Sequence, residues 1–493
     1  MQAATNVEAA DGVAVIDAAP VNSATSRELY KKREPIYPKL VRGKFRTLKW
    51  FLLIATLGVY YLLPWVRWTR GPGEPDQAVL VDFAGGRFYF FFIEIWPSEL
   101  YYVTGLLILA AVGLFLATAL FGRIWCGYAC PQTVWTDLYI AAERLIEGDR
   151  NKRMKLAKAP WTFEKIRKKT MKHAVWIAIA AATGGAWVFY FHDAPTVFSQ
   201  IFTGEAPASA YLFIAILTFT TYMLAGSMRE QVCTYMCPWP RIQAALTDEE
   251  TLQVTYKRDR GEPRGAHKMG EAWEGRGDCI DCKMCVAACP MGIDIREGAQ
   301  LECINCALCI DACDDIMAKI DRPKGLIAYD TDKNMARRVD GLAPKIRLMR
   351  SRTLFYGAVF VIVSTIMVFA LTTRATLDVN ILRDRTPPFV QLSDGSIRNA
   401  YTLKIANKAN VERAFIVSIS GIEAVQVDAI GEAANENEVR LSVRGDDVRA
   451  VRFFATLPAD AERRASMPLT FTVREAATGE KKENATVFLT ERQ

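Results

Sequence analysis

Eight of the twelve cysteines in this 493-residue sequence lie in one block between residues 279 and 313. The block reads CIDCKMCVAACP at 279–290 and CINCALCIDAC at 303–313, so the spacing C-x2-C-x2-C-x3-C occurs twice. At this spacing three thiolates wrap a short loop around one 4Fe-4S cluster, and the fourth ligates a neighbouring cluster. The pattern predicts one cluster bound by Cys279, Cys282, Cys285 and Cys313. It predicts a second cluster bound by Cys303, Cys306, Cys309 and Cys289.

The competing interpretation of this block is a pair of structural zinc sites. Zinc sites usually combine two C-x2-C pairs, which two triplets with one following cysteine each match poorly. The second motif ends in CDD where the first ends in CP, which removes a rigid turn residue but no ligand. The sequence therefore favours a ferredoxin-like module with two 4Fe-4S clusters.

Such a module moves single electrons but needs a donor. The sequence has no G-x-G-x-x-G or P-loop pattern for a nucleotide cofactor, and no C-x-x-C-H pattern for covalent haem. Its three histidines stand at 173, 192 and 267, which does not allow a bis-histidine haem within the membrane. We therefore expect a separate electron donor, which the sequence does not identify.

The other four cysteines form two copies of C-x-x-x-C-P, CGYACP at 126–131 and CTYMCP at 233–238. If each apolar helix before them continues that far, the spacing puts both sulfurs of a pair on one helix face. The following proline would then end or kink the helix. We expect both pairs at the same depth, forming one catalytic or metal site from Cys126, Cys130, Cys233 and Cys237.

Thiolates favour Cu(I), zinc or iron–sulfur clusters, and Met236 could add a thioether ligand. Three alternatives remain for these four cysteines. They could hold a third cluster, they could cycle through a disulfide, or they could be ordinary buried residues of membrane helices.

The elements that must position these cysteines include five stretches long enough to cross a bilayer. These are residues 48–66, 97–121, 173–191, 209–228 and 353–373. Lysine and arginine mark the cytoplasmic side, with nine in 27–49 and twelve in 122–172, against three in 67–88 and none in 192–208. The formal charge of +7 is thus a sign of topology, and we expect no nucleic acid partner.

This topology predicts a multi-domain protein with a five-helix transmembrane region. Residues 1–47 form a largely disordered cytoplasmic tail, and 48–228 contain helices one to four with a basic cytoplasmic loop at 122–172. Residues 229–352 form the cytoplasmic iron–sulfur module, 353–373 the fifth helix, and 374–493 a domain on the far side. In that last domain about seven short runs, such as YTLKIAN and VRFFATL, alternate as strands do, which predicts an all-β sandwich.

The order of these parts resembles the CcoG/FixG/RdxA family, the cytochrome c oxidase accessory proteins of bacteria. The resemblance rests on RFYFFFIEIWPSELYYVTGLL, both C-x-x-x-C-P motifs, the cysteine block and LDVNILRDR, and it covers nearly all of the chain beyond residue 30. It implies an immunoglobulin-like fold for the C-terminal domain. It also implies a multi-pass protein of the bacterial inner membrane, with its C-terminal domain in the periplasm.

The function that the resemblance implies is reduction of Cu(II) to Cu(I) during assembly of a cbb3-type oxidase. Cys126, Cys130, Cys233 and Cys237 would then bind copper or pass electrons to it. The implied partners are the lipid bilayer and factors for copper delivery or oxidase assembly. Two alternatives stay open, a quinol dehydrogenase subunit like NapH or NosR, and an assembly scaffold whose clusters are structural.

Overall fold

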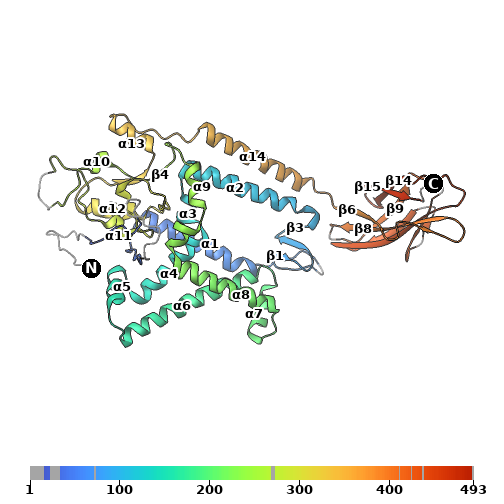
Figure 1. Ribbon diagram of the computed structural model, residues 1–493, viewed down its shortest axis with the longest axis horizontal. Coiled ribbons are helices and arrows are strands. Elements are labelled where there is room, and N and C mark those ends of the chain that lie inside the picture. Colours follow the sequence, from blue (N-terminus) through green and yellow to red (C-terminus); the bar gives the residue numbers. More distant parts are fainter. Residues whose placement is uncertain are drawn as a thin grey trace. The chain divides into compact units, whose positions relative to one another are not determined.

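The chain folds into two compact units, and Figure 1 shows the course of the chain through each. The computed structural model describes residues 16–22, 34–71, 74–267, 273–409, 411–423, 425–432, 434–435 and 438–490. The first unit is Met1–Thr69 with Pro75–Met367, and the second is Arg70–Glu74 with Val368–Gln493. The cysteine block and the long apolar helices before it therefore belong to one unit.

Four helices within the described residues are long and apolar enough to cross a membrane. They are α1 (Lys44–Leu62), α2 (Tyr101–Phe121), α8 (Ala208–Thr221) with its π-helical continuation η4 (Tyr222–Met228), and α14 (Ser351–Thr372). They match four of the five predicted spans. The remaining predicted span, 173–191, falls in α6 (Phe163–Val188), a helix of 26 residues whose first half carries charged side chains. Helix α6 is not among the four candidates, so the span at 173–191 remains a prediction.

Glycines allow close packing between these helices, as is common in membrane proteins. A Cβ atom on Gly184 of α6 would lie 2.9 Å from the carbonyl oxygen of Ile214 in α8. Likewise, Gly113 of α2 faces the ring of Phe360 in α14, and the rings of Phe115 and Tyr356 lie 6.2 Å apart. The helices therefore pack in at least two close pairs.

The segment 122–172 is helical, whereas the sequence predicted a basic loop. It contains α3 (Ile124–Tyr128), α4 (Pro131–Glu147), α5 (Arg150–Lys158) and the start of α6. Buried carboxylates of α4 form ion pairs with cations of the same segment, 122–172, and with cations from other parts of the chain. Arg46 Nη1 lies 2.9 Å from Asp137, and Arg229 Nη2 lies 2.9 Å from Glu143. The sequence interpretation counted only lysine and arginine, so it took no account of these acidic partners.

Residues 16–22 pack on the cysteine block, although the sequence placed them in a disordered tail. The Ile16 N–H donates to the carbonyl of Cys282 over 3.2 Å, and the Val21 N–H donates to Gly292 over 2.7 Å. Ile16 and Ala18 are buried in the apolar core of the module, which gives this short segment its binding energy. Residues 1–15 and 23–33 of the predicted tail lie outside the described residues.

The module around the cysteines is built from short elements. Strand β4 (Gln253–Tyr256) pairs antiparallel with β5 (Ile327–Asp330), and the short helices are α10 (Arg258–Gly261), α11 (Met284–Ala288), η6 (Ile295–Glu297), α12 (Leu308–Lys319) and α13 (Asp332–Val339). The Asp311 carboxylate of α12 accepts the N–H of Arg46 over 2.7 Å and so caps the N-terminus of α1. The module is thereby fixed to the first apolar helix.

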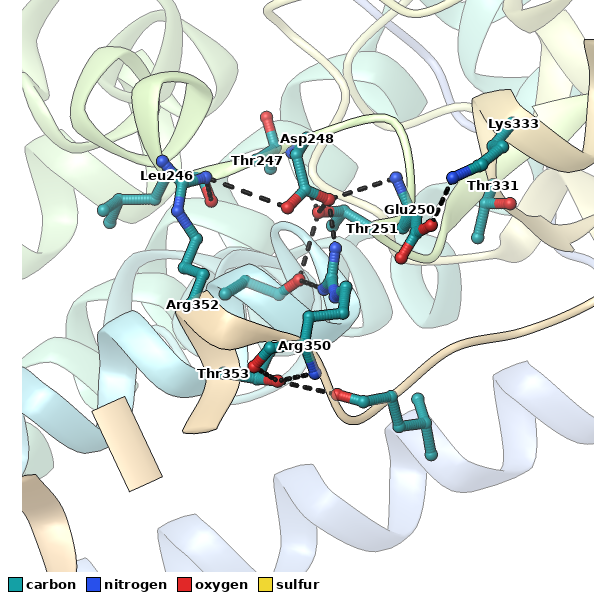
Figure 2. Close-up of polar contacts among 12 residues, drawn as sticks. Leu246, Thr247, Asp248, Glu250, Thr251, Thr331, Lys333, Arg350, Arg352 and Thr353 are labelled. Carbon is teal, nitrogen blue, oxygen red and sulfur yellow. Dashed lines mark hydrogen bonds and ion pairs between the residues drawn. The ribbon is translucent and has the colours of Figure 1, made fainter. Parts of the chain in front are cut away.

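A polar cluster around Asp248 ties the module to two further helices (Figure 2). Asp248 pairs with Arg350, whose Nη2 also donates to the carbonyl of Ala119 over 2.6 Å. Thr251 Oγ1 donates to the same carbonyl over 3.0 Å, and Arg352 donates to Leu246 over 3.0 Å. The carbonyl of Ala119 near the C-terminus of α2, which has no partner within the helix, is thus satisfied in part from the start of α14.

At the other end of these helices lies a small three-stranded sheet of β1 (Val79–Asp82), β2 (Arg87–Phe90) and β3 (Ile93–Ile95). The N–H of Val81 donates to the carbonyl of Tyr190, just beyond α6, over 2.8 Å. Gln77 Nε2 donates to Phe189 over 2.7 Å, and its Oε1 accepts from Ala194 at the start of α7 (Ala194–Thr203) over 2.9 Å. The sheet is therefore bound to the C-terminal end of α6.

The second unit is a β-sandwich, as predicted. One sheet has the order β10 (Gln426–Ala429), β13 (Asp447–Leu457), β8 (Ile397–Asn407) and β6 (Leu377–Arg383), with β7 (Val390–Gln391) pairing with β8. The other runs β11 (Ala434–Asn435), β12 (Glu438–Val443), β9 (Arg413–Ser420), β14 (Ser466–Glu475) and β15 (Lys481–Leu489). Alternate residues such as Tyr401, Leu403, Phe471 and Val473 are fully buried between the sheets.

Candidate cluster and thiol site

The two cysteine motifs adopt the same backbone conformation. Asp281 and Lys283 have φ angles of 54° and 56°, and the equivalent residues Asn305 and Ala307 have 53° and 59°. Two left-handed residues in each short loop turn backbone N–H groups inward. The N–H of Met284 donates to the Cys282 thiol, and that of Asn305 donates to the Cys303 thiol. Such donors favour the thiolate form that an iron–sulfur cluster requires.

The fourth cysteine of each motif lies with the other motif. Burial raises the pKa of Cys313, and the nearby thiols of Cys285, Cys282 and Cys279 raise it further. Burial also raises the pKa of Cys289 to about 12, with Cys306 and Cys303 as the neighbouring thiols. The reason is local, because α11 and α12 carry Cys289 and Cys313 away from their own loops. We refer to Cys279, Cys282, Cys285 and Cys313 as the first set, and to Cys289, Cys303, Cys306 and Cys309 as the second set.

The surroundings of the second set fit a cluster. Its four thiols line a cavity of about 20 Å³, together with Cys285 and aliphatic side chains such as Met291, Ile293 and Ile304. Two sets of four thiols, each buried or half-buried, with inward N–H donors form a donor set suited to 4Fe-4S clusters. When bound, such clusters supply single-electron transfer. The assignment of these eight cysteines as the ligands remains a prediction.

The two membrane motifs do not place their cysteines on continuous helices. Helix α2 ends at Phe121, Cys126 lies on the five-residue helix α3, and Cys130 is the residue before α4, whose first residue is Pro131. Cys233 lies in the π-helical turn η5 (Val232–Met236), and Cys237 follows it. One helix face was expected only if each apolar helix continued to its motif, and that condition is not met. Proline fits the first position of a helix, so Pro131 begins a helix and does not end one.

The structure nevertheless brings all four cysteines to one cavity of about 250 Å³, which we call the thiol cavity. Other residues that line it are Leu114, Arg123, Trp125, Gln132, Thr133, Trp239, Pro240, Leu301, Glu302 and Ile304. Met236, the suggested thioether ligand, does not line this cavity and is 55% exposed. No group of three or more histidine, cysteine or acidic side chains in the described part of the chain is close enough to hold a single metal ion. The four thiols thus line the cavity walls.

Burial and the neighbouring thiols of this cavity raise the pKa of Cys126 and of Cys233 to about 12. Without a bound cation these thiols are therefore protonated at neutral pH. A soft metal ion that binds here must displace protons. Cys126 Sγ meanwhile donates to Gln243 Oε1 over 3.1 Å, and Gln243 is completely buried.

The thiol cavity adjoins the second set. Leu301, Glu302 and Ile304, which line the cavity, flank Cys303 in the sequence, and Ile304 also lines the cavity of the second set. Tyr128 Oη donates to the carbonyl of Cys306 over 3.2 Å. Gly127 and Tyr128 belong to the first C-x-x-x-C-P motif, but nothing in that motif marked them as contacts of the loop that carries Cys303 and Cys306. Nothing in the sequence indicated that Arg123 or Gln243 belongs to this site.

Comparisons with known proteins agree with this architecture. Residues 228–332 match a family described as a 4Fe-4S dicluster domain, residues 103–152 match a 4Fe-4S binding domain, and residues 367–491 match the IG-like fold at the C-terminus of FixG. The nitrogen fixation protein FixG of Rhizobium meliloti is 50% identical over 92% of this chain and 93% of its own length. The chain belongs to the FixG family.

Two further relatives come from Cereibacter sphaeroides. RdxB is 49% identical over 93% of this chain and 97% of its own length, and RdxA is 51% identical over 89% and 92%. With its iron–sulfur domains and apolar helices, this FixG-family chain is a membrane iron–sulfur protein of the oxidoreductase type. The match at 103–152 includes Cys126 and Cys130, which keeps a third cluster among the alternatives for the thiol cavity.

Proposed function

We propose that this FixG-family protein is a cupric reductase that supplies Cu(I) for assembly of a cbb3-type haem–copper oxidase. The eight cysteines of the two motifs would hold the clusters, which would supply one electron to each Cu(II) and be oxidised by one electron as Cu(I) forms. A low-potential one-electron carrier outside this chain would then reduce the clusters again. Copper is the substrate, and the thiol cavity is the place where it is reduced.

The observation that carries this proposal is the position of the thiol cavity. Four soft donors from two distant segments line one cavity, and that cavity touches the loop of the second set. Thiolates stabilise Cu(I) relative to Cu(II), so they favour the reduced product.

The arrangement in the membrane belongs to the same proposal. Helices α2 and η4 both end at the thiol cavity, so they run in the same direction and a return crossing must lie between them. Helix α6 supplies it, because Lys172, just before its apolar part, pairs with Glu143, and Tyr190 contacts β1 just beyond its end. We thus propose five spans in the inner membrane, with the iron–sulfur module in the cytoplasm and the sandwich in the periplasm. The sandwich would dock copper-delivery or oxidase assembly factors.

The test is an anaerobic assay of purified protein reduced with dithionite and freed of excess reductant. Addition of Cu(II) should oxidise the clusters, and a Cu(I)-specific chelator should detect one Cu(I) for each electron lost. The variants Cys126→Ser with Cys130→Ser, and Cys233→Ser with Cys237→Ser, should each slow this reaction at least tenfold while their clusters stay intact. Combining both pairs should add little, as expected for residues of one site.

The same preparation tests the alternatives. Oxidised protein that accepts electrons from a quinol, and reduced protein that leaves Cu(II) unchanged, would contradict the copper proposal and favour a quinol dehydrogenase. Iron content separates the metal hypotheses, because two clusters give about eight irons per chain and a third gives about twelve. Loss of four irons from the thiol-pair variants would assign the cavity to a third cluster.

A further inference from the structure

Arg123 lies between the second set and the thiol cavity. It follows the end of α2, its side chain is buried, and it lines the thiol cavity. Its guanidinium donates to the carbonyls of Leu301 and Cys303, the latter over 3.4 Å. It also donates to Pro240 over 2.9 Å, so one side chain joins both membrane motifs to the loop of the second set.

The two loops that Arg123 joins are in close contact. A Cβ atom on Gly127 would lie 2.6 Å from the carbonyl oxygen of Ile304, so only glycine lets the backbones approach this closely. Trp239 and Pro240 line the other side of the thiol cavity. The charged residues that line this cavity are Arg123 and Glu302.

We propose that Arg123 is a positioning residue of the electron path from the second set to the thiol cavity. It holds the Leu301–Cys303 backbone against the 126–130 loop, and it places a permanent positive charge between the two sites. The second set, and not the first, is then the donor to the thiols. This inference deepens the proposed function, and the role of the second set as electron donor to the thiols rests on that function.

The charge has a defined physical effect. A cluster bound by four thiolates becomes more negative on reduction, so a nearby cation stabilises the reduced form and raises the reduction potential. Because Arg123 is buried, solvent and salt screen this interaction weakly. Replacing it by a neutral residue should therefore lower the reduction potential of the second set.

The experiment compares Arg123→Gln, Arg123→Lys and a control in full-length anaerobic protein by redox titration with EPR detection. The control is Arg241→Gln, which removes an exposed arginine from α9 (Trp239–Leu246) beside the same cavity. A Cys306→Ala variant identifies the signal of the second set. In Arg123→Gln this signal should keep its intensity, but its reduced-to-oxidised ratio at a fixed potential should fall about tenfold, which is about 59 mV for one electron.

The Arg123→Lys variant separates charge from position. Its reduced-to-oxidised ratio at the same fixed potential should stay within a factor of about two of the wild-type ratio. Cu(II) should nevertheless reoxidise the clusters several-fold more slowly, because lysine cannot bridge three carbonyls in the same way. An unchanged potential in Arg123→Gln, or a shift confined to the first set, would overturn the inference. If Arg123→Gln loses its iron, an unchanged reoxidation rate in Arg123→Lys would overturn it instead.

The inference and the proposed function can fail separately. A lowered potential in Arg123→Gln, in a protein whose wild type leaves Cu(II) unchanged, would support the placement of Arg123 and contradict the copper proposal. If Arg123→Gln and Arg123→Lys both reduce Cu(II) as fast as wild type and the potential of the second set is unchanged, the copper proposal would be supported and the placement of Arg123 contradicted.

Discussion

At the scale of single residues, each thiol takes its role from which other thiols it meets. Cys289 follows three cysteines of its own motif, yet its neighbours are Cys306 and Cys303. Cys313 in turn meets the first set. Exchange of the fourth cysteine links the two motifs, so neither loop can form its complete set without the other.

This exchange predicts which cluster each substitution damages. Cys313→Ala should remove or convert the cluster of the first set, and Cys289→Ala should affect that of the second set, because each leaves three thiols behind. EPR spectra of the reduced proteins, with iron content as the check, would show which signal is lost. If each alanine damaged the cluster nearest to it in sequence, the exchange would be wrong.

At the scale of elements, α4 is the part that turns a basic segment into a folded one. Glu143 is buried and pairs with Arg229, Arg153 and Lys172, which come from three other segments. Burial alone would raise the pKa of Glu143, but these cations lower it below its ordinary value. A single carboxylate thus holds α5, α6 and the turn after η4 together.

Glu143→Gln should therefore destabilise the protein by about 3–5 kcal/mol at neutral pH, since it leaves buried cations without their partner. Because the folded-state pKa is lowered, this stabilisation is complete above the ordinary pKa and is lost as the pH falls through the folded value. Unfolding followed by circular dichroism should show a constant difference from wild type between about pH 6 and 8, and a smaller one in acid.

The matched control is Glu164→Gln, which removes an exposed carboxylate that pairs with Lys168 on α6. It should change stability little, because exposed pairs contribute little. Equal effects of the two substitutions would mean that the α4 network is not a structural centre.

At the scale of the whole molecule, the number of membrane crossings decides which side each unit faces. With the N-terminus in the cytoplasm, five crossings put the iron–sulfur module in the cytoplasm and the sandwich in the periplasm. Without the α6 crossing the two sides would be exchanged, because α14 separates the module from the sandwich in either case. A reporter fused after residue 250 should read cytoplasmic and one at the C-terminus periplasmic, following the distribution of lysine and arginine. A periplasmic reading after residue 250 together with a cytoplasmic reading at the C-terminus would remove α6 from the membrane and contradict the return crossing proposed for it.

The sequence alone predicted the features that depend on local spacing. The C-x2-C-x2-C-x3-C motifs, four of the long apolar helices and the alternating strands of the sandwich each follow from repeats of a few residues, and the family follows from the order of these parts. Local signals of this kind survive in the sequence because they arise from backbone geometry.

Only the tertiary structure decided which distant segments meet. The convergence of Cys126 and Cys130 with Cys233 and Cys237 was a hypothesis in the sequence, and Arg123, Gly127 and Gln243 gave no signal at all. The helices α3 to α5 were hidden because the partners of their charges lie up to about a hundred residues away. Contacts across such distances depend on how whole elements pack, and no short pattern of residues records that packing.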